Sequence, residues 1–213
     1  SMVLSMLVSP FIILNANEWV MKWSASDWLQ QSLGMTQIAQ KSIDIEKHII
    51  ICGYGRCGQN LAKLLKTQKV PYMALDLDPD RVRRAQSHGE QVVYGDAARL
   101  QSLMAVGLER ASAVVVTYLE NASAMRVLAL TKEHAPQVPV IVRTQDDLDL
   151  EKLQAAGAAE VVPETIEGSL MLATHALALV GVPMKRVIRM VQEQRNQRYA
   201  LLKDFDRGSE VED

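Results

Sequence analysis

The sequence contains few of the residues that characterise several common classes of protein. Aromatic residues make up 5% of its 213 positions and the formal net charge is −2, so the composition favours neither base stacking nor electrostatic binding of nucleic acid. Two cysteines, Cys52 and Cys57, flank one turn, which argues against a disulfide framework and fits a reducing compartment. No second Cys or His pair stands at ligand spacing. We therefore expect no nucleic-acid partner and no metal site.

The start of the chain lacks charge, yet its apolar run is shorter than the roughly 20 residues that a membrane-spanning helix requires. This run extends from Met2 to Leu14, and no charged residue precedes Glu18. Three tryptophans follow it, as they do where a helix leaves a membrane, and no basic segment precedes it as in a signal peptide. We interpret residues 1–23 as the end of a last transmembrane helix or an interfacial segment, with an ordinary buried helix as the alternative. The polar residues 24–47 are interpreted as a linker.

A glycine-rich turn follows the first strand-like run of the chain. Apolar residues run from Ile49 into the pattern Gly-x-Gly-x-x-Gly that ends at Gly58, and a helical pattern comes next. Gly53 would permit the tight turn, Gly55 the close approach of a phosphate, and Gly58 close packing of helix on strand. A strand, turn and helix in this order place backbone N–H groups and the positive end of a helix at one point, which is a phosphate site. The same glycines also fit a turn that simply needs small residues, so the context has to decide.

From His48 onward, short β-type runs alternate with helical patterns, which predicts a Rossmann-like α/β fold with a doubly wound, parallel, six-stranded sheet. The predicted strands lie near His48–Cys52, Tyr72–Asp76, Gln91–Tyr94, Ala113–Thr117, Val140–Arg143 and Glu160–Val162. The predicted helices between them lie near Gly58–Thr67, Pro79–His88, Ala98–Val106, Ala122–His134 and Leu148–Ala156.

The pattern changes after Pro163. Two further helices are predicted, Thr165–Val180 and Met184 to about Leu202, and their apolar residues offer packing for another subunit. We assign residues 48–163 to a nucleotide-binding domain, 164–207 to C-terminal helices with a dimer interface, and 208–213 to an acidic tail.

Asp76 ends the second predicted strand, 18 residues after Gly58. An acidic side chain at this place accepts hydrogen bonds from ribose hydroxyls, and its charge disfavours the 2′-phosphate of NADP. Capping of the next helix is the alternative role, but Asp78 followed by Pro79 fits that role better. The order of strand, glycine turn, helix, strand and aspartate therefore favours a nucleotide site.

Further candidates stand after the third and fourth strands. Asp96 and Thr117 follow these strands at the carboxyl edge of the sheet, where ligands bind in open α/β folds. Each fits either contact with the adenine or ribose, or capping of the helix that follows. Arg56 in the glycine turn fits pairing with a phosphate, with simple exposure as the alternative. No catalytic domain of substantial size and no Ser/His/Asp order follows the sheet, so we expect a ligand sensor and not an enzyme.

Three segments together resemble the TrkA-N (KTN or RCK) family: Ile50–Gln59 around the glycine turn, Leu75–Asp80, and Tyr94–Ala97. Within that family the chain is most similar to the cytoplasmic domains of Kef-type glutathione-regulated potassium-efflux systems, over about residues 48–180.

This resemblance implies a homodimer that holds AMP or NAD(H) and that binds glutathione or its adducts as regulatory ligands of K+/H+ antiport. It also implies a membrane antiporter domain in the same chain, an ancillary activating subunit, and a place on the cytoplasmic side of the inner membrane. For glutathione it points to Lys63 and Asn196, whereas Pro163 stands where close members carry an arginine. The residues expected at the nucleotide are Gly53, Tyr54, Gly55, Arg56, Cys57, Gly58, Asp76, Leu77, Asp78, Gly95, Asp96, Ala97 and Thr117.

Two other functions stay open at this point. One is a small NAD-dependent oxidoreductase, which would need an acid or base residue beside the nicotinamide. The other is a free-standing regulatory subunit of a potassium-uptake system, without a membrane helix of its own.

Overall fold

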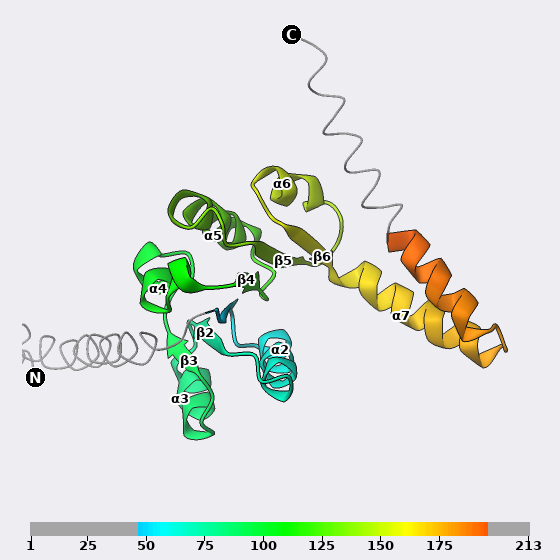
Figure 1. Ribbon diagram of the computed structural model, residues 1–213, viewed down its shortest axis with the longest axis horizontal. Helices are drawn as coiled ribbons and strands as arrows, with labels where there is room; N and C mark the ends of the chain where they lie inside the picture. Colours follow the sequence, from blue (N-terminus) through cyan, green and yellow to red (C-terminus); the bar gives the residue numbers. More distant parts are fainter. Residues whose placement is uncertain (1–46, 196–213) are drawn as a thin grey trace, which may run out of the picture.

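The computed structural model describes residues 47–195 (Figure 1). The interpretations of residues 1–46, of Asn196 and of the acidic tail fall on segments outside the described residues.

One parallel sheet of six strands forms the centre of the described domain (Figure 1). The strands follow the order β3-β2-β1-β4-β5-β6 across the sheet, and Ile50 of β1 stands in register with Met73 of β2 and Val114 of β4. The order reverses between β1 and β4, and such a reversal opens a crevice at the carboxyl ends of the strands. This is the doubly wound Rossmann-like sheet that the sequence predicts, so that prediction is confirmed. The strands are β1 (Ile49–Cys52), β2 (Tyr72–Asp76), β3 (Val92–Tyr94), β4 (Ala113–Val116), β5 (Val140–Thr144) and β6 (Glu160–Pro163).

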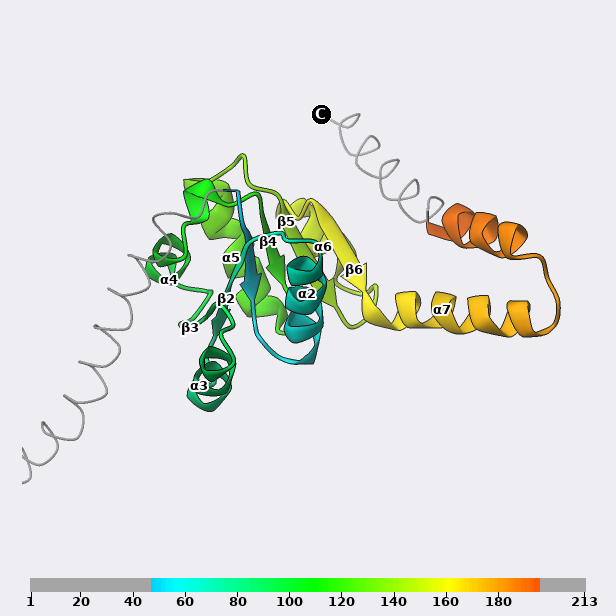
Figure 2. The ribbon, with the colours of Figure 1, turned by 60° about the horizontal axis from the view of Figure 1, so that its bottom comes forward.

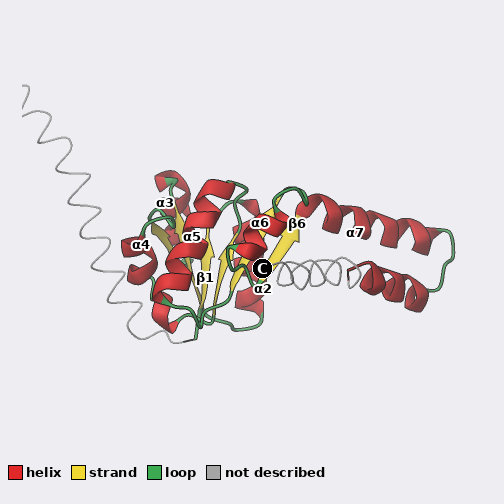
Figure 3. Ribbon diagram, turned by 90° about the horizontal axis from the view of Figure 1, so that it is seen from above, coloured by secondary structure: helices red, strands yellow, loops and turns green. Residues whose placement is uncertain are grey.

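Helices cover both faces of the sheet (Figure 3). One face packs α4 (Leu100–Ala105), the 3-10 helix η1 (Leu108–Arg110), α5 (Asn121–His134) and α6 (Leu150–Ala155) into the larger apolar cluster. The other face packs α2 (Arg56–Thr67) and α3 (Pro79–Ser87) into a second cluster. Successive residues of β1 alternate between the two clusters, because side chains along a strand point to opposite faces. The larger cluster therefore includes residues of all six strands, and the second cluster includes residues of β1, β2 and β3.

Each predicted strand is present, with ends within one residue of the prediction. Three helices begin two residues from the prediction: α4 and α6 begin later, and α2 begins earlier, at Arg56, because it starts inside the glycine turn with Gly55 as its N-cap. As predicted, Asp78 caps α3: its side chain accepts hydrogen bonds from the backbone N–H groups of Asp80 and Arg81, and Pro79 fills the first turn.

Helix α7 (Glu164–Leu179) leaves the sheet directly after β6. It continues through a turn at Gly181 into a second helical stretch at residues 184–195, and the two form a hairpin that projects from the domain (Figure 2). None of the sixteen residues of α7 is buried within the single chain. None of the helices in residues 47–195 combines the length and the hydrophobicity that crossing a bilayer requires.

A cluster of three polar side chains on the α2 face, Tyr72, Glu90 and Lys66, leads to a prediction about how stability depends on pH. The Tyr72 hydroxyl donates to Glu90, and Lys66 Nζ lies 2.8 Å from Glu90 Oε1. The hydrogen bond from Lys66, followed by that from Tyr72, lowers the pKa of Glu90 below its ordinary value of 4.5. Since folding lowers this pKa, the carboxylate stabilises the fold above pH 4.5 and loses this contribution as the pH falls through the folded value.

We expect Glu90→Gln to reduce the free energy of unfolding by about 1 kcal/mol at neutral pH, and the reduction to shrink as the pH falls below 4.5 and through the folded pKa of Glu90. Urea unfolding at neutral pH and at a series of acidic pH values measures it, with the exposed Glu109→Gln as the control. An equal loss at every pH would contradict the role of the charge.

Candidate functional site

A cleft of about 1030 Å³ lies at the carboxyl edge of the sheet. Its walls come from the segments that follow β1, β2, β3 and β4, from the end of β5 and from the start of α7 (Figure 1). Such a volume stands at the upper end of small-molecule sites, which range from about 300 to 1,000 Å³. The residues that line it are Gly53, Gly55, Arg56, Cys57, Asn60, Leu61, Leu64, Leu75, Asp76, Leu77, Arg81, Gly95, Asp96, Ala97, Thr117, Tyr118, Leu119, Glu120, Ser123, Arg143 and Glu164.

The glycine turn has the geometry that the three glycines predict. Gly53 has a φ of +98°, a conformation in which a side chain would be strained. A Cβ on Gly58 would lie 2.1 Å from the carbonyl oxygen of Gly53, so only glycine allows α2 to pack against the turn. A Cβ on Gly55 would meet nothing within 4 Å, which means that the backbone at Gly55 borders open space in the cleft. The turn therefore leaves room for a ligand group directly at the start of α2.

The start of α2 is suited to an anion. Gly55 makes no side-chain cap, and no acidic residue stands in the first turn. The first N–H groups of a helix have no partner within it, and they carry the positive end of the helix dipole. Arg56 is exposed, lines the cleft, and forms no ion pair within residues 47–195. Backbone donors and one cation thus face the same part of the cleft, which fits a phosphate group.

Thr117 stands behind the glycine turn. Its hydroxyl lies 2.7 Å from the carbonyl oxygen of Gly53 and 3.1 Å from that of Cys52, and its side chain is buried. Of the two alternatives for Thr117, the structure excludes capping of α5, whose N-cap is Glu120, and it shows that the hydroxyl holds the turn against β4. The hydroxyl of Thr117 is a positioning group for the turn, a role that the sequence pattern does not reveal.

Asp76 is the central acidic residue of the cleft and is only 5% exposed. The backbone N–H of Tyr54 donates to its Oδ2 at 2.5 Å, and the N–H of Asp78 donates to its Oδ1 at 2.8 Å. The Nη1 atom of Arg81 lies 2.8 Å from both carboxylate oxygens. The hydrogen bond to Asp76 raises the pKa of Arg81, so this guanidinium stays charged. Asp76 thus ties the glycine turn, the end of β2 and α3 together.

Two further aspartates hold the loops beside Asp76. Asp78 caps α3, and the hydrogen bond from the backbone N–H of Arg81 is the main cause that lowers its pKa. Asp96 accepts from the backbone N–H of Ala98 at 2.9 Å and pairs with Arg99 at 3.4 Å. Because the N-cap of α4 is Arg99, Asp96 stabilises the turn that precedes the helix and does not cap it. Asp96 also borders the cleft.

The structure brings ten of the thirteen residues predicted at the nucleotide into the cleft lining; the exceptions are Tyr54, Gly58 and Asp78. The Tyr54 side chain is buried in the core on the α2 and α3 face, and only its backbone N–H reaches Asp76. Gly58 and Asp78 shape the turn and the cap. Lys63 is exposed on α2 and does not line the cleft, and Asn196 lies outside the described residues.

Several lining residues were not predicted from the sequence, and Arg143 is the most informative of them. Its Nη1 donates to the carbonyl oxygen of Thr117 at 2.6 Å, and its other terminal nitrogen pairs with Glu164, the first residue of α7. Tyr118 meets Ser123 through their hydroxyls at 2.8 Å, and burial raises the pKa of Tyr118. An arginine at the end of the apolar run Val140–Thr144 is the one signal in the sequence that marks this side of the cleft.

No histidine lines the cleft, and within residues 47–195 no three His, Cys, Asp or Glu side chains are grouped to hold a metal. Cys52 is fully buried, and this burial raises its pKa to about 12, whereas Cys57 is half-buried at the cleft; both thiols are free.

Comparison with known proteins gives matches over the same part of the chain. The sequence profile of the TrkA-N domain matches residues 49–164. A K(+) efflux antiporter KefB of Alkalimonas amylolytica is 37% identical over 98% of this chain and 32% of its own length. K(+) efflux antiporter 2, chloroplastic, of Arabidopsis thaliana is 34% identical over 85% of this chain and 15% of its own length. The chain therefore spans about a third or less of the length of these curated relatives.

Solved structures agree with the fold. The Kef CTD of Shewanella denitrificans, in AMP-bound form, is 28% identical with a TM-score of 0.64, over 74% of this chain and 96% of that one. The TrkA-N domain of the inner membrane protein ybaL from Escherichia coli is 25% identical with a TM-score of 0.58, over 61% of this chain and 96% of that one.

Proposed function

Because the chain belongs to the TrkA-N domain family, we propose that it is the ligand-sensing regulatory part of a potassium-efflux antiporter and that its cleft holds AMP or NAD(H). The observation that carries the proposal is the pairing of two features in one cleft: the open backbone at Gly55 beside the start of α2, and the buried carboxylate of Asp76. A phosphate fits the first feature and a ribose the second. The AMP-bound form of the Kef CTD relative supports an adenine nucleotide.

A sensing role agrees with the groups in the cleft. The hydride transfer of an oxidoreductase requires an acid or base beside the reacting carbon. No histidine lines the cleft formed by the described residues, but Tyr118, Glu120 and Glu164 do, so an assay for NADH turnover is needed to separate the two functions. The side chains of Arg81 and Arg143 line the cleft and pair with acidic neighbours, so a bound ligand can compete for these ion pairs.

The cleft also has a direct connection to the hairpin. Arg143 contacts the loop after β4 and pairs with Glu164, so the same side chain borders the ligand and holds the first turn of α7. A ligand shifts an equilibrium between two arrangements only if it binds one of them more tightly. We propose that the ligand does so by favouring one position of Arg143, and that α7 passes this difference to a membrane domain.

We further propose that two copies of the chain pair through the hairpin, and that glutathione or its adducts bind at this dimer. Lys63 and Asn196 are the residues that the resemblance to Kef-type systems indicates for binding glutathione. Pro163, a buried residue at the end of β6 and the N-cap of α7, supplies no cation there. We therefore expect glutathione to bind more weakly than the nucleotide. In this arrangement the domain works on the cytoplasmic side of the inner membrane.

Thermal unfolding with added ligand tests the nucleotide site. After removal of bound ligand, AMP or NADH at a hundredfold excess over Kd should stabilise the protein by about 2.7 kcal/mol and raise Tm by about 8 °C. Asp76→Asn should weaken AMP about tenfold because it removes a charged acceptor for the ribose. Asp80→Asn is the matched control, since Asp80 is exposed in the first turn of α3, four residues after Asp76, and does not line the cleft. The absence of a Tm shift with every adenine nucleotide would contradict the proposal, and turnover of NADH would indicate an oxidoreductase instead.

The same titration with glutathione and an S-alkyl glutathione examines the regulatory ligand. We expect a smaller shift than with AMP, and Lys63→Ala should remove it while the AMP shift remains. A glutathione shift that survives Lys63→Ala would place that ligand elsewhere.

A further inference from the structure

The carboxylate of Asp76 has no acceptor position left for a ribose in the described structure. Each carboxylate oxygen accepts about two hydrogen bonds. Oδ1 receives one from the N–H of Asp78 and one from Arg81, and Oδ2 receives one from the N–H of Tyr54 and one from Arg81. Binding of ribose hydroxyls to Asp76 therefore requires that one of these donors gives way.

Arg81 is the donor that can move. The N–H groups of Tyr54 and Asp78 are held by the glycine turn and by the end of β2, so they are part of the fold. The Arg81 side chain is flexible, 35% exposed and part of the cleft wall. It also has a second partner, since its Nη2 lies 3.1 Å from Asp78 Oδ2. When the ribose takes its place at Asp76, Arg81 can keep this ion pair and stay beside the sugar.

The charge at the ribose is consequently different from that of a lone carboxylate. Asp76 and Asp78 both pair with Arg81. Asp78 also stands at the positive end of α3. The charge of Asp76 is thus compensated by Arg81, and an arginine beside the ribose is the usual partner of a 2′-phosphate.

We propose that Arg81 sets the selectivity of this cleft at the ribose 2′ position, so that nucleotides with a 2′-phosphate bind nearly as well as those with a 2′-hydroxyl. The proposal rests on the nucleotide site proposed above and goes beyond it. It replaces the expectation from Asp76 alone, which is rejection of NADP. The ligand class is therefore an adenosine phosphate with either substituent at the 2′ position.

Two matched ligand pairs test it: 5′-AMP against adenosine 2′,5′-bisphosphate, and NADH against NADPH. The quantity to measure by calorimetry is a ratio within each pair: the Kd of the ligand with a 2′-phosphate divided by the Kd of the ligand with a 2′-hydroxyl. We expect a ratio below about 10 for the unchanged protein, and a rise of at least tenfold in Arg81→Gln, because the uncompensated Asp76 then repels the 2′-phosphate. Affinity for 5′-AMP should rise, because the acceptor positions that Arg81 occupies on Asp76 become free.

Three further variants control the result. Arg81→Lys retains the charge and should keep the ratio of the unchanged protein. Arg83→Gln lies on the same helix, is exposed and does not line the cleft, so its ratio should also stay the same. Asp76→Asn removes the charge that Arg81 compensates, so adding it to Arg81→Gln should bring the ratio back to that of the unchanged protein. A ratio that rises less than tenfold in Arg81→Gln, or that changes in Arg81→Lys, overturns the proposal; if Arg81→Gln does not fold, a ratio well above 10 in the unchanged protein overturns it. If neither 5′-AMP nor NADH binds the unchanged protein, the nucleotide site itself is wrong.

Discussion

Gly58→Ala is expected to destabilise the protein by about 3 kcal/mol and to abolish nucleotide binding. A Cβ at this position would lie 2.1 Å from the carbonyl oxygen of Gly53 and 3.1 Å from its carbonyl carbon. Both are backbone atoms, so no side chain can move aside and α2 must shift away from the turn. The shift would pull the start of α2 away from the cleft, and the hydroxyl of Thr117, 3.3 Å from the same Cβ, restricts any other direction. Tm should fall by about 9 °C.

Gly55→Ala is the control that separates folding from binding. Gly55 has a φ of −70°, which any residue adopts, and its Cβ would meet nothing within 4 Å. We expect the free energy of unfolding to change by less than about 1 kcal/mol, the cost of alanine at an N-cap. The added methyl group would nevertheless occupy space that a phosphate needs, so AMP affinity should fall at least tenfold. A Gly58→Ala protein with ordinary Tm and ordinary AMP binding would contradict the steric argument, and unchanged AMP binding in Gly55→Ala would remove the phosphate from this turn.

The order of the sheet and the position of the cleft could be predicted from local patterns. Short apolar runs such as β4 alternate with helical segments, and the pairing of Asp78 with Pro79 marks the start of α3 within a few residues. The three glycines and Asp76 belong to one strand-turn-helix-strand unit, and its spacing predicts that the glycine turn and the end of β2 lie side by side in the cleft. These features depend on neighbours in the chain, and for this reason a single sequence is enough to find them.

The remaining part of the cleft depends on contacts between distant residues. Thr117 meets the carbonyl oxygen of Gly53 across 64 positions, and Arg143 meets Glu164 across 21. Whether a threonine caps a helix or holds a turn is decided by which backbone groups lie next to it, and no spacing rule contains that information. Arg81 is near Asp76 in the sequence, but on a helical pattern it is indistinguishable from the exposed Arg83 until the orientation of α3 is known.

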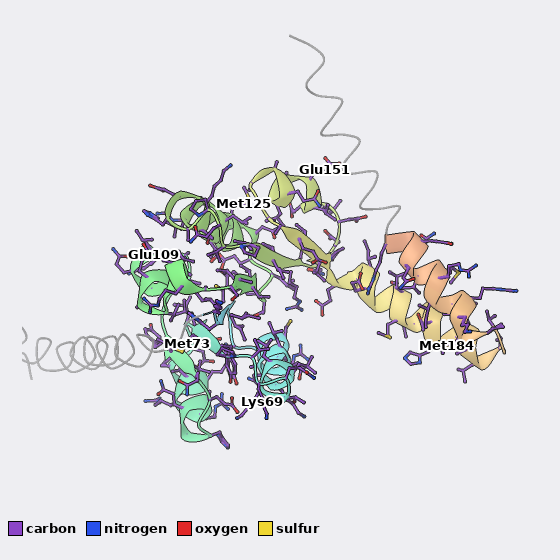
Figure 4. The ribbon with its side chains drawn as sticks, viewed as in Figure 1. Lys69, Met73, Glu109, Met125, Glu151 and Met184 are labelled. Atoms are coloured by element: carbon purple, nitrogen blue, oxygen red, sulfur yellow. The ribbon has the colours of Figure 1, made fainter. Side chains whose placement is uncertain are left out.

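The apolar surface of the hairpin has to be covered in the assembled protein. Leu172 is 73% exposed and Leu179 is 88% exposed, although α7 consists mostly of apolar and small residues. Met184 extends this surface at the far end of the hairpin, well away from the sheet (Figure 4). A helix that is apolar around most of its circumference is normally buried. A contiguous apolar surface of this kind marks an interface.

A second copy of the chain is the partner that we propose for this surface. Both acidic residues of α7 already pair within the chain, Glu164 with Arg143 and Glu167 with Arg195, so the proposed contact rests on the apolar side chains. In a twofold dimer the same surface of each copy faces the other, so the exposed apolar side chains of one hairpin can pack against those of its partner. Three basic residues of the stretch 184–195, which are Lys185, Arg186 and Arg189, then lie toward the rim.

Replacing Leu172 and Leu179 with glutamate is therefore expected to raise the dimer dissociation constant at least a hundredfold, because each substitution buries a charge where an apolar anchor worth about 2 kcal/mol packs. Analytical ultracentrifugation over a range of concentrations measures this change. Met104→Glu is the matched control: Met104 is 40% exposed on α4, at the opposite end of the described domain from α7 (Figure 1), and its replacement should leave the dimer intact.

The two variants also distinguish a dimer from other ways of covering the hairpin. If the unchanged protein is a monomer at about 100 µM, well above the micromolar dissociation constant expected for a specific interface, the second copy is the wrong partner. If it is a dimer that Leu172→Glu with Leu179→Glu does not dissociate, the contact lies on another surface. Dissociation should leave the AMP-induced rise in Tm in place, because the cleft is formed within one chain. If the dimer and the AMP-induced rise in Tm are lost together, the pairing of hairpins maintains the binding site through Glu164 and Arg143.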